Sequence, residues 1–154
     1  MARYVARVRT PMSVVDAFAL VSDMRTFAEW DPGVRAVDQV VGDGPGAGAE
    51  YDVRVSAVPR DLVLRYVTER YEVGSSPTRT WEVLLVARGA LFTSVDLITV
   101  TAAPGGSLVV YDADLRLTGP LRVADLGLRV AFSWIGGRAE AGLRAALRGT
   151  SVPG

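Results

Sequence analysis

The feature that most constrains the fold of this chain is a run of strand-like segments with no helical pattern between them. Each segment is rich in β-branched and aromatic residues, and clusters of Gly, Pro and Ser separate most of them. Parallel strands need long crossover connections, usually helices, so this run predicts a mainly antiparallel sheet. The six predicted strands span residues 34–41, 49–57, 62–73, 80–87, 91–102 and 107–117.

A further strand and two short helices are predicted before this run. Residues 3–9 alternate in the way that is typical of a strand with one buried face. Apolar residues then recur at helical spacing over residues 14–21, where Ser13 is placed to cap the helix. A second short helix is expected over residues 24–28 and should end near Pro32, which disfavours helical geometry at the residue before it.

A long helix is predicted to close the chain. Over residues 120–148 apolar side chains recur at intervals of three, four or seven and form a stripe that can pack on the sheet. Gly136 and Gly137 are expected to weaken or kink this helix, because a glycine in a helix interior costs about 1 kcal/mol relative to alanine. The chain has 154 residues without a repeat or linker, so residues 1–154 are expected to form a single domain.

The residue types that are missing restrict the chemistry of this protein. The chain has no His and no Cys, and all 17 of its basic residues are Arg. These absences exclude nucleophiles paired with histidine, cysteine or histidine metal sites, and Schiff-base lysines. We therefore expect no metal and no other cofactor. Any catalysis would use carboxylates, tyrosines, hydroxyl groups, arginines or backbone amides.

Charge and hydropathy limit the partners. The 17 basic residues are scattered, and 17 acidic residues balance them to a formal net charge of +0. Nucleic acid is therefore not an expected partner, because phosphate binding requires a concentrated basic face. No apolar run reaches the roughly 20 residues that a membrane span needs, and the N-terminus does not follow the signal-peptide pattern. We expect a cytoplasmic protein without an integral membrane segment.

Short motifs at the ends of the predicted elements carry a family resemblance across nearly the whole chain. They are Asp23-x-x-x-x-x-x-Trp30-x-Pro32, Gly46-x-Gly48, Asp96-x-Ile98-x-Val100 and the closing Ile135-Gly136-x-Arg138. With the element order, they resemble the START-like (SRPBCC) superfamily, in particular its bacterial polyketide cyclase/dehydrase-like branch. The closing segment resembles that of uncharacterised actinobacterial members.

The resemblance implies an α+β helix-grip fold of the START/Bet v 1-like kind. In this fold a curved antiparallel sheet of about seven strands surrounds a long C-terminal helix, and two short helices follow the first strand. It also implies an elongated cavity between the sheet and the helix, whose ligands in relatives are apolar and ring-bearing or acyl. Because the superfamily includes carriers, receptors and enzymes on one scaffold, the fold alone does not define the function.

Aromatic and apolar side chains are the candidates for lining that cavity. The polar residues on residues 107–117 share one face, so strand alternation points Tyr111 inward. Rings in such a pocket would stack on a ligand, and phenols would supply hydrogen bonds. The alternative is that the rings fill a small core. The predicted cavity residues are Trp30, Tyr51, Tyr66, Trp81, Asp96, Ile98, Val109, Tyr111, Leu128, Ala131 and Ile135.

Asp96 is the carboxylate of most interest. If Ile98 and Val100 face the core, alternation places Asp96 on the same inner face. Desolvation would then disfavour its charged form and suit it to general acid or base catalysis. The alternatives are an ion pair with Arg54 or Arg79, exposure at a rim, or the opposite strand parity.

Three functions remain open from the sequence. The first is binding of a hydrophobic small molecule, such as a lipid, polyketide or aromatic compound. The second is a cyclase, aromatase or dehydratase acting in the same cavity, in which Asp96, Tyr111 or Tyr66 would move protons. The third is a partner-binding module, such as a homodimer, that uses Phe132 and Trp134 on an exposed patch.

Overall fold

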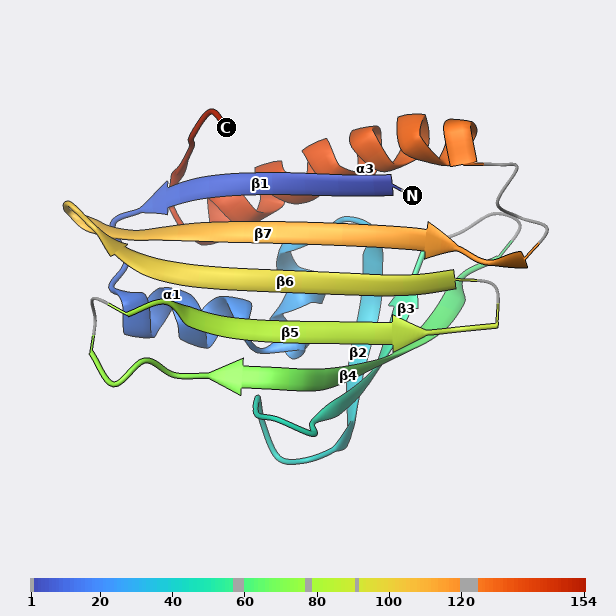
Figure 1. The fold of residues 1–154 in the computed structure, drawn as a ribbon, viewed down its shortest axis with the longest axis horizontal. Helices are drawn as coiled ribbons and strands as arrows, with labels where there is room; N and C mark the ends of the chain where they lie inside the picture. Colours follow the sequence, from blue (N-terminus) through green and yellow to red (C-terminus); the bar gives the residue numbers. More distant parts are fainter. Residues whose placement is uncertain (1, 57–59, 77–78, 91, 120–124) are drawn as a thin grey trace.

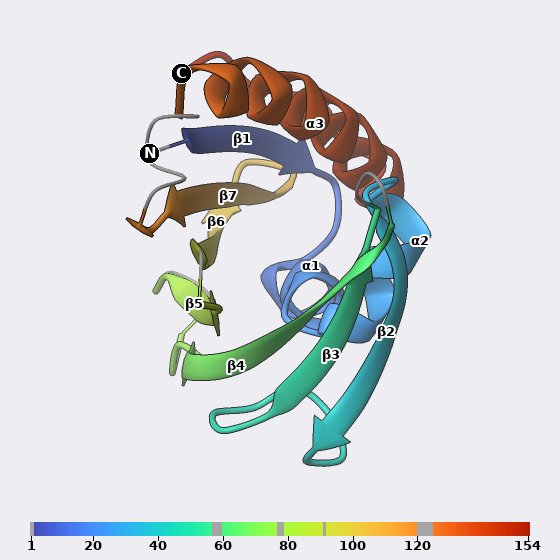
Figure 2. The ribbon, with the colours of Figure 1, turned by 90° about the vertical axis from the view of Figure 1, so that its right-hand side faces the viewer.

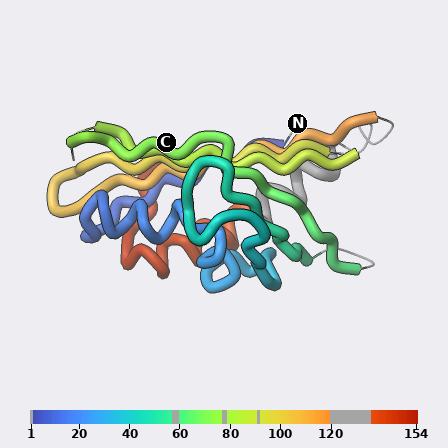
Figure 3. The backbone as a smooth tube through the Cα atoms, turned by 90° about the horizontal axis from the view of Figure 1, so that it is seen from below, coloured from blue at the N-terminus to red at the C-terminus, as the bar shows by residue number. Residues whose placement is uncertain are grey.

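The protein has an α+β architecture in which one curved sheet carries its helices on the concave side (Figures 1 and 2). The seen-from-below view in Figure 3 shows the helices on one side of the strands. The computed structural model describes residues 2–56, 60–76, 79–90, 92–119 and 125–154. For residues 125–135 the description covers the backbone and not the side chains.

The described strands pair antiparallel in the order β2-β3-β4-β5-β6-β7-β1-β8. Irregular register at two places in the β2–β3 pair and one place in the β4–β5 pair accompanies the curvature of this half of the sheet. The strands are β1 (Ala2–Thr10), β2 (Val34–Val41), β3 (Glu50–Val55), β4 (Leu62–Glu72), β5 (Trp81–Arg88), β6 (Phe92–Ala103), β7 (Gly106–Leu117) and β8 (Thr150–Ser151).

The predicted strands are confirmed, each with its ends within two residues of the expectation. The sheet has eight strands within the described chain where about seven were expected, and the additional strand is β8. A strand of two residues is too short to show alternation. It forms only because the chain end returns to β1, where the Val152 amide donates to the Arg7 carbonyl at 2.8 Å.

The helices occupy their predicted positions, and the first begins at its predicted cap. The Ser13 hydroxyl accepts from the Asp16 amide at 3.1 Å and caps α1, and the Asp23 carboxylate accepts from the Arg25 amide at 3.0 Å at the start of η1. The second predicted helix is divided into η1 and α2. The helices are α1 (Val14–Val21), η1 (Met24–Thr26), α2 (Phe27–Trp30) and α3 (Asp125–Ala146). No helix among the described residues is long and apolar enough to cross a membrane.

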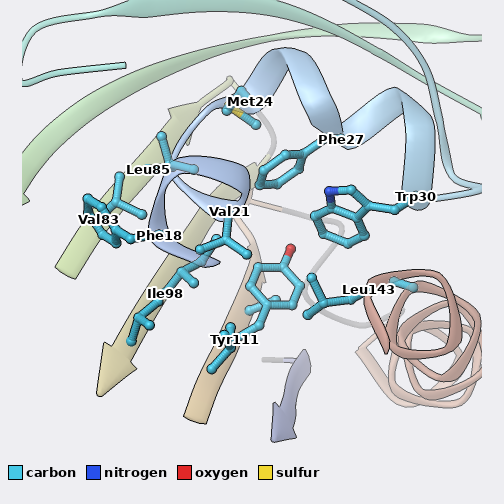
Figure 4. Packing of buried hydrophobic residues seen from close by; sticks show 14 of the residues in the cluster. Phe18, Val21, Met24, Phe27, Trp30, Val83, Leu85, Ile98, Tyr111 and Leu143 are labelled. Carbon is cyan, nitrogen blue, oxygen red and sulfur yellow. The ribbon is translucent and has the colours of Figure 1, made fainter. Parts of the chain in front are cut away.

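The core lies between α1 and the central strands. Phe18 of α1 packs on Trp81 with ring centroids 5.4 Å apart, and Figure 4 shows Phe18 and Val21 above Ile98. Burying each such side chain contributes about 1.5–3 kcal/mol. Opposite this face, ion pairs such as Arg3 with Asp112 lie on the outer side of the sheet. The concave face is therefore mainly apolar, by the same alternation that places most charged residues outside.

Helix α3 lies alongside β1 and spans the opening between β1 and α2 (Figures 1 and 2). It is continuous through Gly136 and Gly137, although the pair was expected to weaken or kink it. A Cβ atom built on Gly136 would lie 2.4 Å from the Tyr4 ring, and one on Gly142 would lie 1.7 Å from the Trp30 carbonyl oxygen. These glycines are tolerated because they let β1 and α2 approach the helix backbone. Residues 120–124 of the predicted helix lie outside the described residues.

Candidate functional site

A cavity of about 720 Å³ lies under the curved sheet, between its concave face, α2, the start of β2 and α3. This volume is within the range of sites for drug-sized ligands. The walls are mainly aliphatic and aromatic. The apolar wall residues on the strands include Val53, Val55, Leu62, Leu64, Phe92 and Leu115.

The cavity runs along the strands and ends where the core begins. On β7 every second residue from Leu117 to Tyr111 lines the cavity, and the next inward-facing residue, Val109, is fully buried in the core. On β6 the lining ends at Asp96, and the next inward-facing residue, Ile98, is again core. The level of Tyr111 and Asp96 is therefore the inner end of the cavity.

Strand β4 closes the cavity at the same level. Leu62, Leu64 and Tyr66 line it in turn, and Thr68 beyond them is buried. Leu62 is 48% exposed, whereas Tyr66 is 7% exposed. The cavity thus passes from an open end near Leu62 to a buried end near Tyr66.

Polar side chains from three strands meet at the buried end. Tyr66 lies opposite Ala87 on β5, and Ala87 lies opposite Ser94 on β6. The small Ala87 side chain leaves room for the Tyr66 ring to reach across it, and the Tyr66 hydroxyl donates to Ser94 Oγ at 3.0 Å. A larger residue than alanine at this position would block that contact.

Asp96 lies two residues beyond Ser94 on the same face and is 4% exposed. Its neighbours across the ladder are Leu85 on β5 and Ala113 on β7, and neither carries a polar side chain. Tyr111 precedes Ala113 by two residues on β7, so it lies diagonally across from Asp96. The carboxyl group is therefore enclosed by apolar side chains and two phenols.

This environment changes the acidity of all three groups. Burial raises the pKa of Asp96 to about 7, hydrogen bonding by Tyr66 and Tyr111 opposes the rise, and the nearby Asp31 carboxylate adds to it. Burial and the charge of Asp96 also raise the pKa values of both phenols well above the usual range. The two phenols therefore remain protonated donors at neutral pH, while Asp96 titrates there.

Asp31 is a cavity residue that the sequence analysis did not single out. It follows α2, and its Oδ1 accepts from the Gly33 amide at 2.8 Å. Burial raises its pKa, and the Gly33 hydrogen bond opposes that rise. The sequence feature that could have indicated Asp31 is its position between Trp30 and Pro32 in the helix-end motif.

The structure brings three of the predicted cavity residues together and leaves five elsewhere. Tyr66, Asp96 and Tyr111 line the inner end. The others belong to or pack against the core around α1 and α2 and do not line this cavity: Trp30, Tyr51, Trp81, Ile98 and Val109.

The rings of Trp30 and Trp81 pack against other aromatic side chains. Trp30 packs edge-on against Tyr111 with centroids 6.1 Å apart and so supports the cavity wall from behind. Trp81 is engaged with Phe18. The remaining predicted residues have side chains outside the described part of the chain, and they are Leu128, Ala131, Phe132, Trp134 and Ile135.

A curved antiparallel sheet that encloses an apolar cavity and is closed by a C-terminal helix defines the START-like helix-grip class. Within that class the chain belongs to the family described as "Polyketide cyclase / dehydrase and lipid transport", whose sequence model matches residues 1–148. Hydrophobic ligand binding is the general property of that description. No curated protein sequence matches this chain.

Solved structures share the fold at low sequence identity. A START superfamily protein from Mycobacterium smegmatis has a TM-score of 0.68 at 13% identity, with 96% of this chain and 98% of that chain covered. A STAR-related lipid transfer protein from Xanthomonas axonopodis has a TM-score of 0.67 at 18% identity, covering 95% and 85%. A hypothetical protein from Helicobacter pylori has a TM-score of 0.73 at 8% identity, covering 96% and 87%. At these identities the likeness shows the fold alone.

Proposed function

We propose that this protein binds a largely apolar small molecule in the cavity between its sheet and α3. The observation that carries the proposal is a cavity of about 720 Å³ with apolar walls and one polar cluster at its buried end. Apolar walls supply affinity through burial, and a few polar groups fix the orientation of the ligand. The family description, which includes lipid transport, supports the same assignment.

A variant that fills the cavity tests this proposal. Ala113 lies on the cavity wall beside Asp96, so Ala113→Phe places a ring in the space that a ligand needs. Val110 lies on the opposite face of the same strand, and Val110→Phe is the matched control. The probe is N-phenyl-1-naphthylamine, an uncharged apolar dye whose fluorescence rises on binding.

We expect saturable dye binding by the wild type and by Val110→Phe, and a loss of affinity of about tenfold or more in Ala113→Phe, since its ring occupies the site. Circular dichroism checks that both variants are folded. Equal dye affinity in Ala113→Phe and the wild type would place binding outside this cavity and contradict the proposal.

A second candidate function is proton transfer on a carbonyl compound held in the same cavity. The observation that favours it is a buried carboxyl group with a pKa of about 7 beside two protonated phenols. Ionised Asp96 would accept a proton from the carbon next to a carbonyl group, while a Tyr66 or Tyr111 hydroxyl donates to the carbonyl oxygen that gains charge. Return of the proton to carbon or to a departing hydroxyl completes the step.

Deuterium exchange tests this second function without knowledge of the natural substrate. The methyl hydrogens next to the carbonyl group of 2-acetonaphthone exchange slowly with heavy water, and NMR follows that exchange. Catalysed exchange by the wild type that is lost in Asp96→Asn would support the enzyme. If the protein binds the ketone but exchange proceeds at the rate seen in buffer alone, the protein binds this compound without catalysing proton transfer.

A further inference from the structure

The polar groups of the cavity lie at its buried end, and this sets the orientation of the ligand. On β4, β6 and β7 the lining residues run from Leu62, Phe92 and Leu117 at one end to Tyr66, Asp96 and Tyr111 at the other. Inward-facing residues beyond the second set are buried in the core. A ligand that satisfies the polar cluster must therefore place its polar atom innermost.

We infer that the ligand is uncharged and enters oxygen first, with a carbonyl or hydroxyl oxygen at Asp96, Tyr66 and Tyr111 and its apolar body toward Leu62 and Leu117. This inference rests on the proposed binding function and deepens it. It predicts an apolar ketone or alcohol and excludes a carboxylic acid in this orientation.

Hydrogen-bond capacity supports an oxygen acceptor. The phenols of Tyr66 and Tyr111 hydrogen-bond to Asp96, and the Tyr66 hydroxyl also lies 3.0 Å from Ser94 Oγ, so the proton of neutral Asp96 is the donor left for a ligand oxygen. Figure 4 shows the Tyr111 hydroxyl directed away from its strand toward α2. A protonated Asp96 donates to a ligand carbonyl oxygen, whereas ionised Asp96 repels a carbonyl oxygen and can only accept from a ligand hydroxyl.

The charges around the inner end disfavour an anion. The charged groups that act most strongly on Asp96 are the carboxylates of Asp31 in the cavity and Asp112 on the outer face of β7. A ligand carboxylate at the inner end would lie beside Asp96 and Asp31 in an apolar enclosure, where an uncompensated charge is costly. Two arginines, Arg35 on β2 and Arg138 on α3, also line the cavity, and both residues are exposed to solvent.

Apart from the charged groups already named, the described elements around Asp96 contribute side chains without charge. They are Tyr4 on β1, Met24 on η1, Phe27 on α2, Val53 on β3, Leu85 on β5 and Ala139 on α3. The protonation of Asp96 is therefore the main change of charge at the inner end between pH 6 and pH 8.5. Loss of its proton removes a donor and adds a negative charge beside the ligand oxygen.

Three naphthalene probes of similar size test the inference. They are naphthalene, the ketone 2-acetonaphthone and the carboxylate 2-naphthoate, each competed against N-phenyl-1-naphthylamine at pH 6.0 and pH 8.5. At pH 6.0 we expect the ketone to bind about tenfold more tightly than naphthalene and 2-naphthoate to bind more weakly than both. At pH 8.5 the ketone should lose about tenfold in affinity, while naphthalene is unchanged.

Two variants test whether this pH effect arises from the carboxyl group of Asp96. Asp96→Asn keeps the size of the side chain but does not titrate, so its affinity for the ketone should be equal at the two pH values. Asp38 on β2 is exposed, and Asp38→Asn should keep the pH dependence of the wild type. If Asp96→Asn does not fold, the affinities of the wild type for the three probes at the two pH values still test the inference.

The outcomes separate the inference from the proposed function. If naphthalene binds but the ketone binds no better, or if its affinity is the same at both pH values, the inference is wrong and cavity binding stands. Tightest binding of 2-naphthoate would also overturn it, in favour of anion binding by Arg35 and Arg138. Failure of every probe and of the dye would contradict the proposed function itself.

Discussion

Burial of Asp96 at the inner end of the cavity makes the folding stability of the protein depend on pH. Its carboxyl group is 4% exposed, and burial raises its pKa from 3.8 to about 7. The folded protein therefore holds this proton more tightly than the unfolded chain. The stability linked to it is fully present below pH 3.8 and is lost as the pH rises through 7.

Replacing Asp96 with asparagine should remove this pH dependence. Between pH 5.0 and pH 8.5 the wild type should lose about 2–3 kcal/mol of unfolding free energy relative to Asp96→Asn, because it must ionise a buried group. Urea denaturation of both proteins at the two pH values measures this difference. Asp38→Asn is the control, since its carboxylate is exposed. An equal pH response of Asp96→Asn and the wild type would show that Asp96 is not buried in this way.

The sequence predicted the inward side of Asp96 and Tyr111 because strand alternation determines which face a side chain occupies. Alternation does not determine how far along the strand α1 covers that face. Ile98 and Val109 lie on the correct face but beneath α1, so they belong to the core. Trp81 is absent from the lining for a related reason, since it packs on Phe18. Where the core ends and the cavity begins depends on how the helices pack on the sheet. The alternation of residues within a strand does not determine that packing.

At the level of elements, contact between α3 and β1 depends on one glycine of a pair. The Tyr4 ring lies where a Cβ atom on Gly136 would be, at 2.4 Å, whereas nothing lies within 4 Å of the corresponding point on Gly137. The Tyr4 hydroxyl also donates to Glu140 one turn further along the helix. Both glycines carry the same cost in helix propensity, so they form a matched pair.

Alanine at these two positions should have opposite effects. Gly137→Ala should stabilise the protein by about 0.5–1 kcal/mol through helix propensity. Gly136→Ala gains the same propensity but forces the Tyr4 ring away, and we expect a net loss of about 1–3 kcal/mol. Chemical denaturation of the two variants measures both values.

A double variant separates the ring contact from other effects at Gly136. With Tyr4→Ala the ring is absent, so adding Gly136→Ala should then cost little or should stabilise. Equal costs of Gly136→Ala with and without Tyr4 would show that the helix does not pack on this ring.

The predictability of the elements follows from their length. Strands such as β6 and β7, with twelve residues each, carry enough alternation to be recognised within one residue of their ends. β8 has two residues and depends on Gly149, where a Cβ atom would lie 2.4 Å from the Arg9 carbonyl oxygen. Its pairing is a consequence of where α3 ends, and only the folded chain defines that place.

At the level of the whole molecule, a ligand in the cavity would contact β3, β4, β6, β7, α2 and α3 together. Because only the folded chain offers this enclosure, binding should raise the stability of the entire domain and not of one element.

The thermal midpoint should therefore rise with ligand concentration. A ligand at 100 times its Kd contributes about 2.7 kcal/mol, which corresponds to about 5–10 °C for a domain of this size. Differential scanning calorimetry with 2-acetonaphthone at pH 6.0 measures the shift, and a single transition should move as a whole. Ala113→Phe should show no shift, because its ring occupies the inner end, whereas Val110→Phe should shift like the wild type. The same shift in Ala113→Phe would mean that the ketone stabilises the fold from another site, and the cavity would then have no part in binding it.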